Sequence, residues 1–191
     1  VSVDLPTIVI PTGPMVVGHH KGEVLGACTD CRRLWAAHRA GDIDAEEIDA
    51  INARLAPSVG TCMVMGTAST MACMVEAMGL SLPMSATVPA PHAERMRIAE
   101  ASGKRAAEMA ISGAPRPSAI LTAGAFHNAM VVLQAIGGST NGLVHLCAIA
   151  NRVKQRIDLD AFDAIGRQVP VLIDLKPSGQ HYMEHFHHAG G

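Results

Sequence analysis

The chain has 191 residues, a net charge of −2 at neutral pH and 49% hydrophobic residues, which indicate a well-buried globular protein and exclude a disordered one. Aromatic residues make up only 3%, while methionine occurs 11 times, so we expect an aliphatic, methionine-filled core with little surface for stacking nucleic-acid bases. No basic run marks a nucleic-acid partner, and no apolar stretch approaches the roughly 20 residues that span a bilayer.

In chain order, the β-branched run at residues 5–10 predicts a buried strand, because it is bounded by prolines. A helix is expected over residues 30–40, and a second one begins after Asp42 or Asp44 and ends before Pro57. Hydrophobic periodicity and glycine breaks predict further helices over residues 67–77, 92–111, 123–136, 141–153 and 159–167.

The last part of the chain predicts a strand over residues 169–174, followed by a turn and a final helix. Helices that alternate with sparse buried strands indicate an α/β fold. We therefore expect a layered α/β/α architecture with many helices and few, mainly parallel strands, forming part of a domain. The first and last residues read like the interior of a longer chain, so we interpret the sequence as an internal fragment.

Cys62 stands in the stretch Gly60-Thr-Cys-Met-Val-Met-Gly-Thr-Ala-Ser-Thr-Met71, in a loop that precedes a helix of small residues. A thiolate near a helix N-terminus is stabilised by the helix dipole and by free backbone N–H groups. Small residues let the backbone approach a bulky inorganic group. The hydroxyls of Thr67, Ser69 and Thr70 are close enough in sequence to form hydrogen bonds with such a group. The same features fit a buried cysteine at a tightly packed helix start, so both interpretations stay open.

Cys28 and Cys31 form a CxxC pair, a spacing found in zinc half-sites and redox pairs. No second CxxC or histidine pair follows at zinc-finger spacing, so we interpret the pair as structural. Cys73 and Cys147 fall on apolar helix faces and are expected in the core. An odd number of cysteines without a secretory signal argues against a disulfide framework and favours the reducing cytoplasm.

His181, Glu184 and His185 match H-x-x-E-H, the inverted zinc-protease pattern. The histidine pair could bind Zn²⁺ from one helix face, with Glu184 as base and with His187 or His188 as a third ligand. A short pattern arises easily by chance in a chain with ten histidines. The motif therefore leaves a protease, adventitious metal binding and no metal role open.

The stretch Gly137-Gly-Ser-Thr-Asn141 separates two expected helices. It could bind phosphate at a helix N-terminus, but it lacks the lysine and the spacing of a P-loop. The simpler interpretation is an interhelix turn in which Ser139 or Thr140 is the N-cap.

The Cys62 stretch and several further blocks resemble, in collinear order, the dihydroxy-acid and sugar-acid dehydratase family of iron–sulfur hydro-lyases. The blocks span nearly the whole chain. They are Pro6-Thr-Ile-Val-Ile-Pro-Thr-Gly-Pro-Met15, Glu76-Ala-Met-Gly-Leu-Ser-Leu-Pro83, Ser85-Ala-Thr-Val-Pro89, Ala135-Ile-Gly-Gly-Ser-Thr-Asn141, Val144-His-Leu146, Asp174-Leu-Lys-Pro-Ser-Gly179, Met183-Glu184 and Ala189-Gly-Gly191.

The resemblance implies that residues 1–191 are part of the N-terminal α/β domain of a dehydratase, without the family's C-terminal domain. It implies that Cys62 is one of three cysteines that hold an iron–sulfur cluster, 2Fe–2S in preference to 4Fe–4S. The other two cysteines, the ligands of Mg²⁺ and the catalytic base are then expected outside this chain, which would be inactive alone. Six side chains are expected near the cluster or substrate: Thr67, Ser69, Thr70, Ser139, Thr140 and Asn141.

The implied reaction removes water from a 2,3-dihydroxy carboxylic acid, with iron as a Lewis acid on the leaving hydroxyl, and gives a 2-oxo acid. The stretch Met65-Gly-Thr-Ala-Ser-Thr70, and Thr29-Asp30 with Trp35, look more like the sugar-acid branch, which acts on pentonates. Dihydroxy-acid dehydratase of branched-chain amino-acid biosynthesis is the alternative. A non-catalytic truncated fragment is the alternative from another class. We expect a small-molecule substrate, a cytoplasmic homo-oligomer at full length, and neither a nucleic-acid nor a membrane partner.

Overall fold

The computed structural model describes residues 1–191 except for the side chain of residue 27. Helices dominate, and a short hairpin supplies the strands. In chain order the elements are β1 (Gly18–His20), β2 (Glu23–Leu25), α1 (Ala27–Ala40), α2 (Ala45–Leu55), α3 (Thr67–Ala77), α4 (Ala93–Ser112), α5 (Pro117–Ile120), α6 (Ala123–Ala135), α7 (Thr140–Arg152), α8 (Leu159–Gln168) and α9 (Met183–His188).

The predicted helices are confirmed to within a few residues at their ends, whereas the hairpin and α5 lie where the sequence predicts no element. Many helices with few strands are compatible with part of an α/β domain. None of the helices, as far as the structure describes the chain, combines the length and apolar character that a bilayer span needs.

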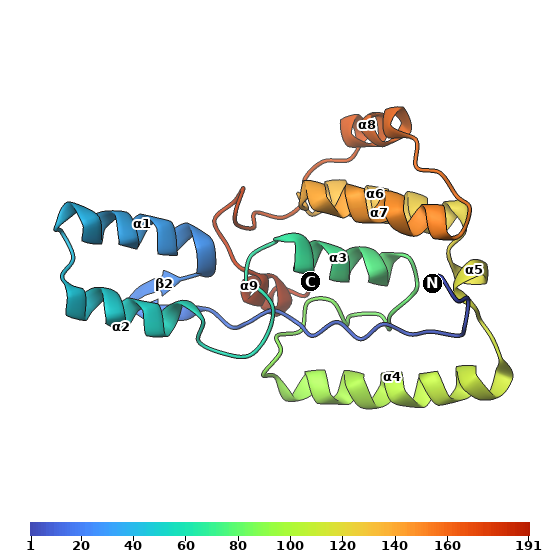
Figure 1. Cartoon of the computed structure of the whole chain (residues 1–191), viewed down its shortest axis with the longest axis horizontal. Coiled ribbons are helices and arrows are strands. Elements are labelled where there is room, and N and C mark those ends of the chain that lie inside the picture. The colour runs from blue at the N-terminus through green and yellow to red at the C-terminus, as the bar shows by residue number, and fades with distance from the viewer.

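The hairpin and helices α1 and α2 form a small lobe at one end of the molecule (Figure 1). Strands β1 and β2 pair antiparallel, with Gly18 opposite Leu25, through a turn in which Lys21 and Gly22 both have positive φ. The Asp44 side chain caps α2 by accepting a hydrogen bond from the Glu47 N–H. The lobe has its own core of buried aliphatic residues: Leu25, Leu34, Ile48 and Ile51.

The main body contains the largest core, between α3, α6 and α7, with α8 packed outside α6 (Figure 1). Aliphatic and methionine side chains fill it, as the composition predicts. Its fully or nearly fully buried members include Met74, Met78, Leu121, Phe126, Ala129, Leu133 and Leu146. Methionine suits such a core because its flexible, unbranched side chain fills irregular gaps.

The two strands predicted at residues 5–10 and 169–174 are not formed, and this part of the prediction is wrong. Each segment makes a backbone hydrogen bond to a helix end or loop instead: Val9 N–H donates to Leu80 O at 2.7 Å, and Leu172 N–H donates to Ala135 O at 2.8 Å. A strand needs a neighbour to accept its ladder, and no strand of the described chain lies beside either segment. Parallel pairing is confined to two isolated bridges, so the expected mainly parallel sheet is absent from the described residues.

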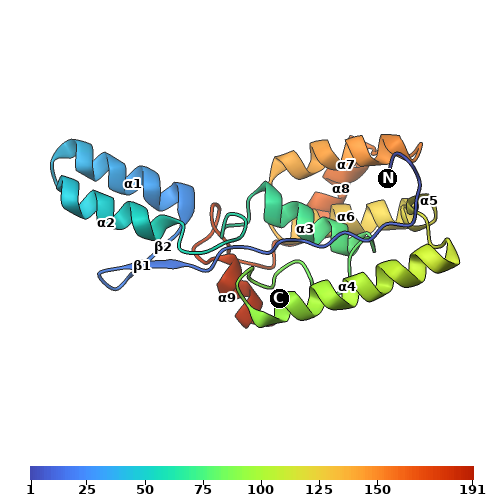
Figure 2. The ribbon, with the colours of Figure 1, turned by 60° about the horizontal axis from the view of Figure 1, so that its bottom comes forward.

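Helix α4 packs against loops and the N-terminal segment, which runs along the molecule between α3 and α4 (Figure 2). Arg95, on the first turn of α4, is buried and donates to three backbone carbonyls. The donors reach Pro11 O and Ser85 O, each at 2.8 Å, and Val88 O. One guanidinium therefore joins the N-terminal segment, the 85–88 loop and α4.

We predict that Arg95→Met lowers the free energy of unfolding by about 3 kcal/mol, because three carbonyls lose a charged donor in a site that water does not reach. Arg97→Met, on the exposed face of the same helix, should change it by less than about 0.5 kcal/mol. Urea unfolding of both variants measures the difference. Equal effects of the two substitutions would contradict the role given to Arg95.

Candidate functional site

Cys62 lies in the loop that leads from the lobe to α3, and its thiol is free and half-buried. The backbone just before it pairs with the segment that precedes β1. Thr61 N–H donates to Gly13 O at 2.9 Å, and Met15 N–H donates to Thr61 O at 2.8 Å. The Cys62 loop is therefore held on this side by main-chain hydrogen bonds that do not depend on side-chain identity.

The C-terminal segment holds the same loop from its other side. Met183 N–H donates to Met63 O at 2.9 Å, and Met65 N–H donates to Lys176 O at 2.8 Å. The Cys62 side chain packs against a buried apolar cluster that includes Met63. These contacts fix the backbone on both sides of Cys62 before α3 begins at Thr67.

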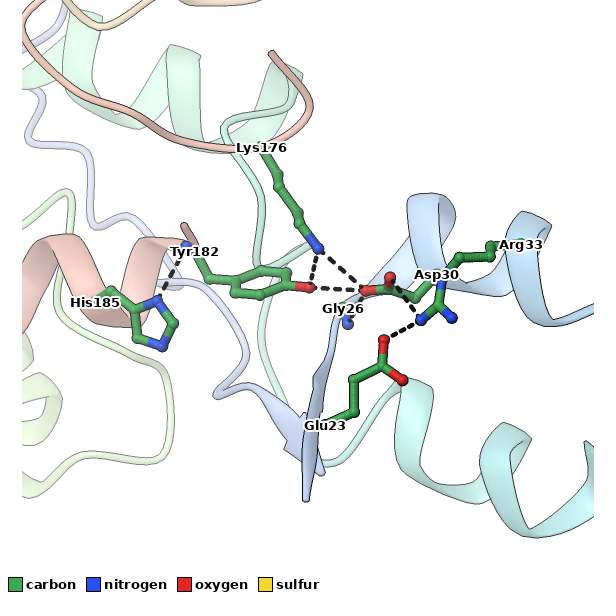
Figure 3. A network of polar contacts seen from close by, with 7 residues as sticks. All are labelled: Glu23, Gly26, Asp30, Arg33, Lys176, Tyr182 and His185. Atoms are coloured by element: carbon green, nitrogen blue, oxygen red, sulfur yellow. Dashed lines mark hydrogen bonds and ion pairs between the residues drawn. The ribbon is translucent and has the colours of Figure 1, made fainter. Parts of the chain in front are cut away.

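A network of polar side chains lies beside this loop and joins α1 to the C-terminal segment (Figure 3). The Tyr182 hydroxyl donates to Asp30 Oδ2 at 2.7 Å, and Gly26 N–H donates to the same oxygen at 2.8 Å. Lys176 Nζ donates to the Tyr182 hydroxyl at 2.5 Å and lies 3.4 Å from Asp30 Oδ2. The Asp30 carboxyl is buried, so these contacts replace its hydration.

The charges in this network follow from its geometry. Burial of the Asp30 carboxyl acts to raise its pKa, but the hydrogen bonds from Tyr182 and Gly26 and the charge of Lys176 outweigh burial, and the pKa lies below its ordinary value. Burial, followed by the hydrogen bond to Asp30, raises the pKa of Tyr182. At neutral pH the network thus holds an Asp30 anion beside a protonated Tyr182.

Four of the six side chains predicted near the cluster or substrate meet at the start of α3. Asn141 Nδ2 donates to Thr67 Oγ1 at 3.0 Å, and the Thr67 and Ser139 hydroxyls lie 3.2 Å apart. Ser139 N–H donates to Thr70 Oγ1 at 3.0 Å. Ser139 is also the N-cap of α7, which confirms the interhelix-turn interpretation of this stretch.

Two glycines allow this close approach of α7 to α3. A Cβ on Gly138 would come within 2.6 Å of the Leu133 side chain and 2.9 Å of Thr70 Cγ2. A Cβ on Gly142 would also come within 2.9 Å of Thr70 Cγ2. The contact between the Thr67 end of α3 and the 139–141 turn therefore requires glycine at both positions.

The other two predicted side chains lie apart from this contact. The Ser69 hydroxyl is buried and has no hydrogen-bond partner among the described residues. The residue is one of those that line an open pocket of about 160 Å³, together with Thr12 and Thr61. Thr140 is exposed. Thr61, the residue that precedes Cys62, is thus on the wall of the same pocket as Ser69.

The remaining four cysteines differ in their surroundings. Cys28 is exposed and Cys31 is half-buried, and both are free thiols near the start of α1. Cys73 and Cys147 pack against hydrophobic clusters, as expected. Burial raises the pKa of the Cys73 thiol to about 12, so it is not a nucleophile at neutral pH.

The two histidine rings of the H-x-x-E-H pattern, His181 and His185, lie 5.7 Å apart but do not share a helix face. Helix α9 begins at Met183, so His181 precedes it and pairs instead with Leu175 in an isolated bridge. Glu184 Oε2 accepts a hydrogen bond from Val17 N–H at 2.7 Å. The arrangement gives no support to the protease interpretation.

Side chains of the types that bind metal ions come together in a different combination from the H-x-x-E-H pattern. Among the described residues, one group of three has ligand atoms within 4.8 Å of one another: His92, Glu184 and His188. Cys62 belongs to no such group, so within this chain its thiol offers a single ligand position.

We predict that Tyr182→Phe lowers the free energy of unfolding by about 1–2 kcal/mol at neutral pH, because the hydroxyl between Asp30 and Lys176 is lost. Since the pKa of Asp30 is lowered in the folded protein, its stabilisation is present above the ordinary value of 3.8 and is lost as the pH falls through the folded value. The difference between wild type and variant should therefore shrink in acid.

Urea unfolding between neutral pH and about pH 3 measures this difference. Asp30→Asn lacks the titrating group and should lose this acid-dependent part of the stability. An undiminished acid dependence in Asp30→Asn would assign the effect to another carboxyl.

Known proteins resemble this chain over its whole length. L-arabonate dehydratase of Azospirillum brasilense is 46% identical over 190 residues, covering 100% of this chain and 32% of the relative. Dihydroxy-acid dehydratases of Caldicellulosiruptor bescii and Thermodesulfovibrio yellowstonii are 40% and 39% identical over 189 residues, each covering 99% of this chain and 34% of the relative. The chain thus spans about a third of the length of the curated relatives it matches.

The family match covers the chain to the same extent as the matches to individual relatives. Residues 1–191 all fall within the match to the family described as dihydroxy-acid/6-phosphogluconate dehydratase N-terminal. Because the match covers the core, the Cys62 loop and the α3 contact together, the chain belongs to the dihydroxy-acid/6-phosphogluconate dehydratase N-terminal family.

Proposed function

We propose that this chain is part of a hydro-lyase that removes water from a 2,3-dihydroxy carboxylic acid to give a 2-oxo acid. The observation that carries the proposal is the family match over residues 1–191, with relatives named as dehydratases. We further propose a sugar acid, such as a pentonate, as the substrate. In support, identity to the L-arabonate dehydratase is 46%, against 39% and 40% for the two dihydroxy-acid dehydratases above.

Cys62 is, in this proposal, one of the ligands of an iron–sulfur cluster, with 2Fe–2S favoured. Its free thiol and the loop fixed on both sides fit one ligand position, and the buried Ser69 hydroxyl on α3 is without a hydrogen-bond partner among the described residues. When bound, a cluster with an open iron position supplies a Lewis acid for the departing hydroxyl. The further cysteine ligands, the ligands of Mg²⁺ and the base belong, by the same proposal, to residues outside this chain.

In this proposal, the chain's own residues shape part of the substrate site and orient the substrate. Thr67, Ser139 and Asn141 present two hydroxyls and an amide in fixed mutual positions, and each can exchange hydrogen bonds with substrate hydroxyls. A site built to bond hydroxyls discriminates strongly against an analogue that lacks them. This supports a polyhydroxylated acid as the substrate. The proposal also includes a cytoplasmic homo-oligomer.

We predict that Cys62→Ser, in the protein at its natural length, reduces bound iron and acid-labile sulfide to a small fraction of wild type, because a serine oxygen replaces the ligand sulfur. Cys28→Ser, an exposed cysteine on α1, is the matched control and should keep both. Elemental analysis and visible absorption give the measurement. Full retention of iron and sulfide in Cys62→Ser would remove Cys62 from the ligand set, and a colourless wild type would favour the non-catalytic alternative.

We also predict that kcat/KM for a pentonate exceeds that for dihydroxyisovalerate by at least about tenfold, which corresponds to roughly 1.4 kcal/mol of transition-state binding. Thr67→Val keeps the shape of the side chain but removes its hydroxyl, and it should reduce turnover of the pentonate more than that of dihydroxyisovalerate. Steady-state kinetics with both acids measure the ratio. A preference for dihydroxyisovalerate would assign the protein to the biosynthetic branch instead.

A further inference from the structure

Three ligand-type side chains meet where the start of α4 faces the C-terminal helix α9. His92 is the N-cap residue of α4, and Glu184 and His188 stand one turn apart on α9. Their ligand atoms all lie within 4.8 Å of one another. Two imidazoles and one carboxylate from two distant segments thus face a common point.

The carboxylate is already oriented by the backbone. Glu184 Oε2 accepts a hydrogen bond from Val17 N–H at 2.7 Å, and Oε1 lies 3.9 Å from His188 Nε2. One oxygen is therefore anchored while the other faces the imidazole. A ligand carboxylate held by an outer hydrogen bond is the usual arrangement around protein-bound metals.

We propose that His92, Glu184 and His188 bind a divalent transition-metal ion of the Zn²⁺ type. Two nitrogen donors and one carboxylate oxygen match the ligands that Zn²⁺ takes in proteins, whereas Mg²⁺ and Ca²⁺ prefer oxygen alone. The His188 side chain is 60% exposed and that of Glu184 is 18% exposed, which leaves room for water as a fourth ligand. None of the three ligands is a side chain that the proposed cluster site at Cys62 uses.

The geometry needs only a small adjustment. Bonds of about 2.0–2.1 Å place the ligand atoms of a tetrahedral zinc site about 3.3 Å apart. The ligand atoms lie within 4.8 Å of one another, and Glu184 Oε1 lies 3.9 Å from His188 Nε2, so binding an ion requires them to move closer together. Rotation of side chains between staggered rotamers is the means by which such an adjustment is made.

The surrounding groups are compatible with a cation. His187 stands beside His188 on α9. Its Nε2 lies 3.7 Å from the Glu94 carboxylate, which adds negative charge near the site. The Arg95 guanidinium donates its hydrogen bonds to backbone carbonyls.

A bound ion would join α9 to α4 directly. Helix α9 follows Tyr182, the residue that reaches Asp30, and Met183 at its start holds the Cys62 loop. The metal would therefore stabilise the position of the segment that supports the loop, acting as a structural ion.

The test is calorimetric titration of ZnCl₂ into the purified protein at its natural length, after removal of loosely bound metal with EDTA. Wild type should show a stoichiometric site that is weakened at least tenfold in His92→Ala, His188→Ala and Glu184→Gln. The glutamine can still accept from Val17 N–H, so this variant removes the charge without removing the anchor. His181→Ala is the matched control, because its side chain is 62% exposed and belongs to the same segment but not to the site.

The deciding variant is His188→Ala, since its exposed side chain can be removed without opening the core. Zn²⁺ should raise the Tm of wild type and of His181→Ala but not that of His188→Ala. The proposal is overturned if wild type shows no stoichiometric site, if the site survives in both His92→Ala and His188→Ala, or if His181→Ala abolishes it.

Discussion

The way in which the lobe is joined to the main body depends on the buried carboxylate of Asp30. It receives hydrogen bonds from the Tyr182 hydroxyl and from Gly26 N–H, with Lys176 beside it. An ionised carboxyl in such a place is tolerated only when hydrogen bonds and a countercharge replace water. Because its partners come from opposite ends of the chain, satisfying this one group joins the lobe to the body.

The Cys62 loop takes its position from that junction. The segment that carries Lys176 and Tyr182 also supplies the main-chain bonds to Met63 and Met65. Side-chain electrostatics on one face of this segment and backbone hydrogen bonds on the other therefore act together. A rigid support of this kind is what a reactive side chain on a loop requires, since loops alone hold their side chains poorly.

Much of the helical framework could be predicted from the sequence, because helix signals are local. Apolar residues at three and four spacing, the Asp44 cap and the glycine stops all act within a few residues. The Ser139 cap follows from the same reasoning. The contact between the start of α3 at Thr67 and the 139–141 turn could be predicted only through the family resemblance, which implied that both segments lie near one site.

The strands and the Asp30 network could not be predicted, for a different reason. A β-branched run favours an extended backbone, but whether it becomes a strand depends on a neighbour that local sequence does not specify. The hairpin gave only the Lys21-Gly22 turn as a signal. The pairing of Asp30 with Tyr182 joins residues from distant segments, and the one local sign was a tyrosine in a chain that is otherwise poor in aromatic residues.

The two glycines between α3 and α7 show how a site can depend on atoms that are missing. Gly138 and Gly142 carry no functional group, yet the space that they leave is filled by the methyl group of Thr70. The hydroxyls and the amide at the neighbouring positions keep their alignment because nothing separates the helices. A map of mutational sensitivity for this protein would therefore mark chemically inert positions as strongly as reactive ones, and ranking residues by chemistry alone would miss them.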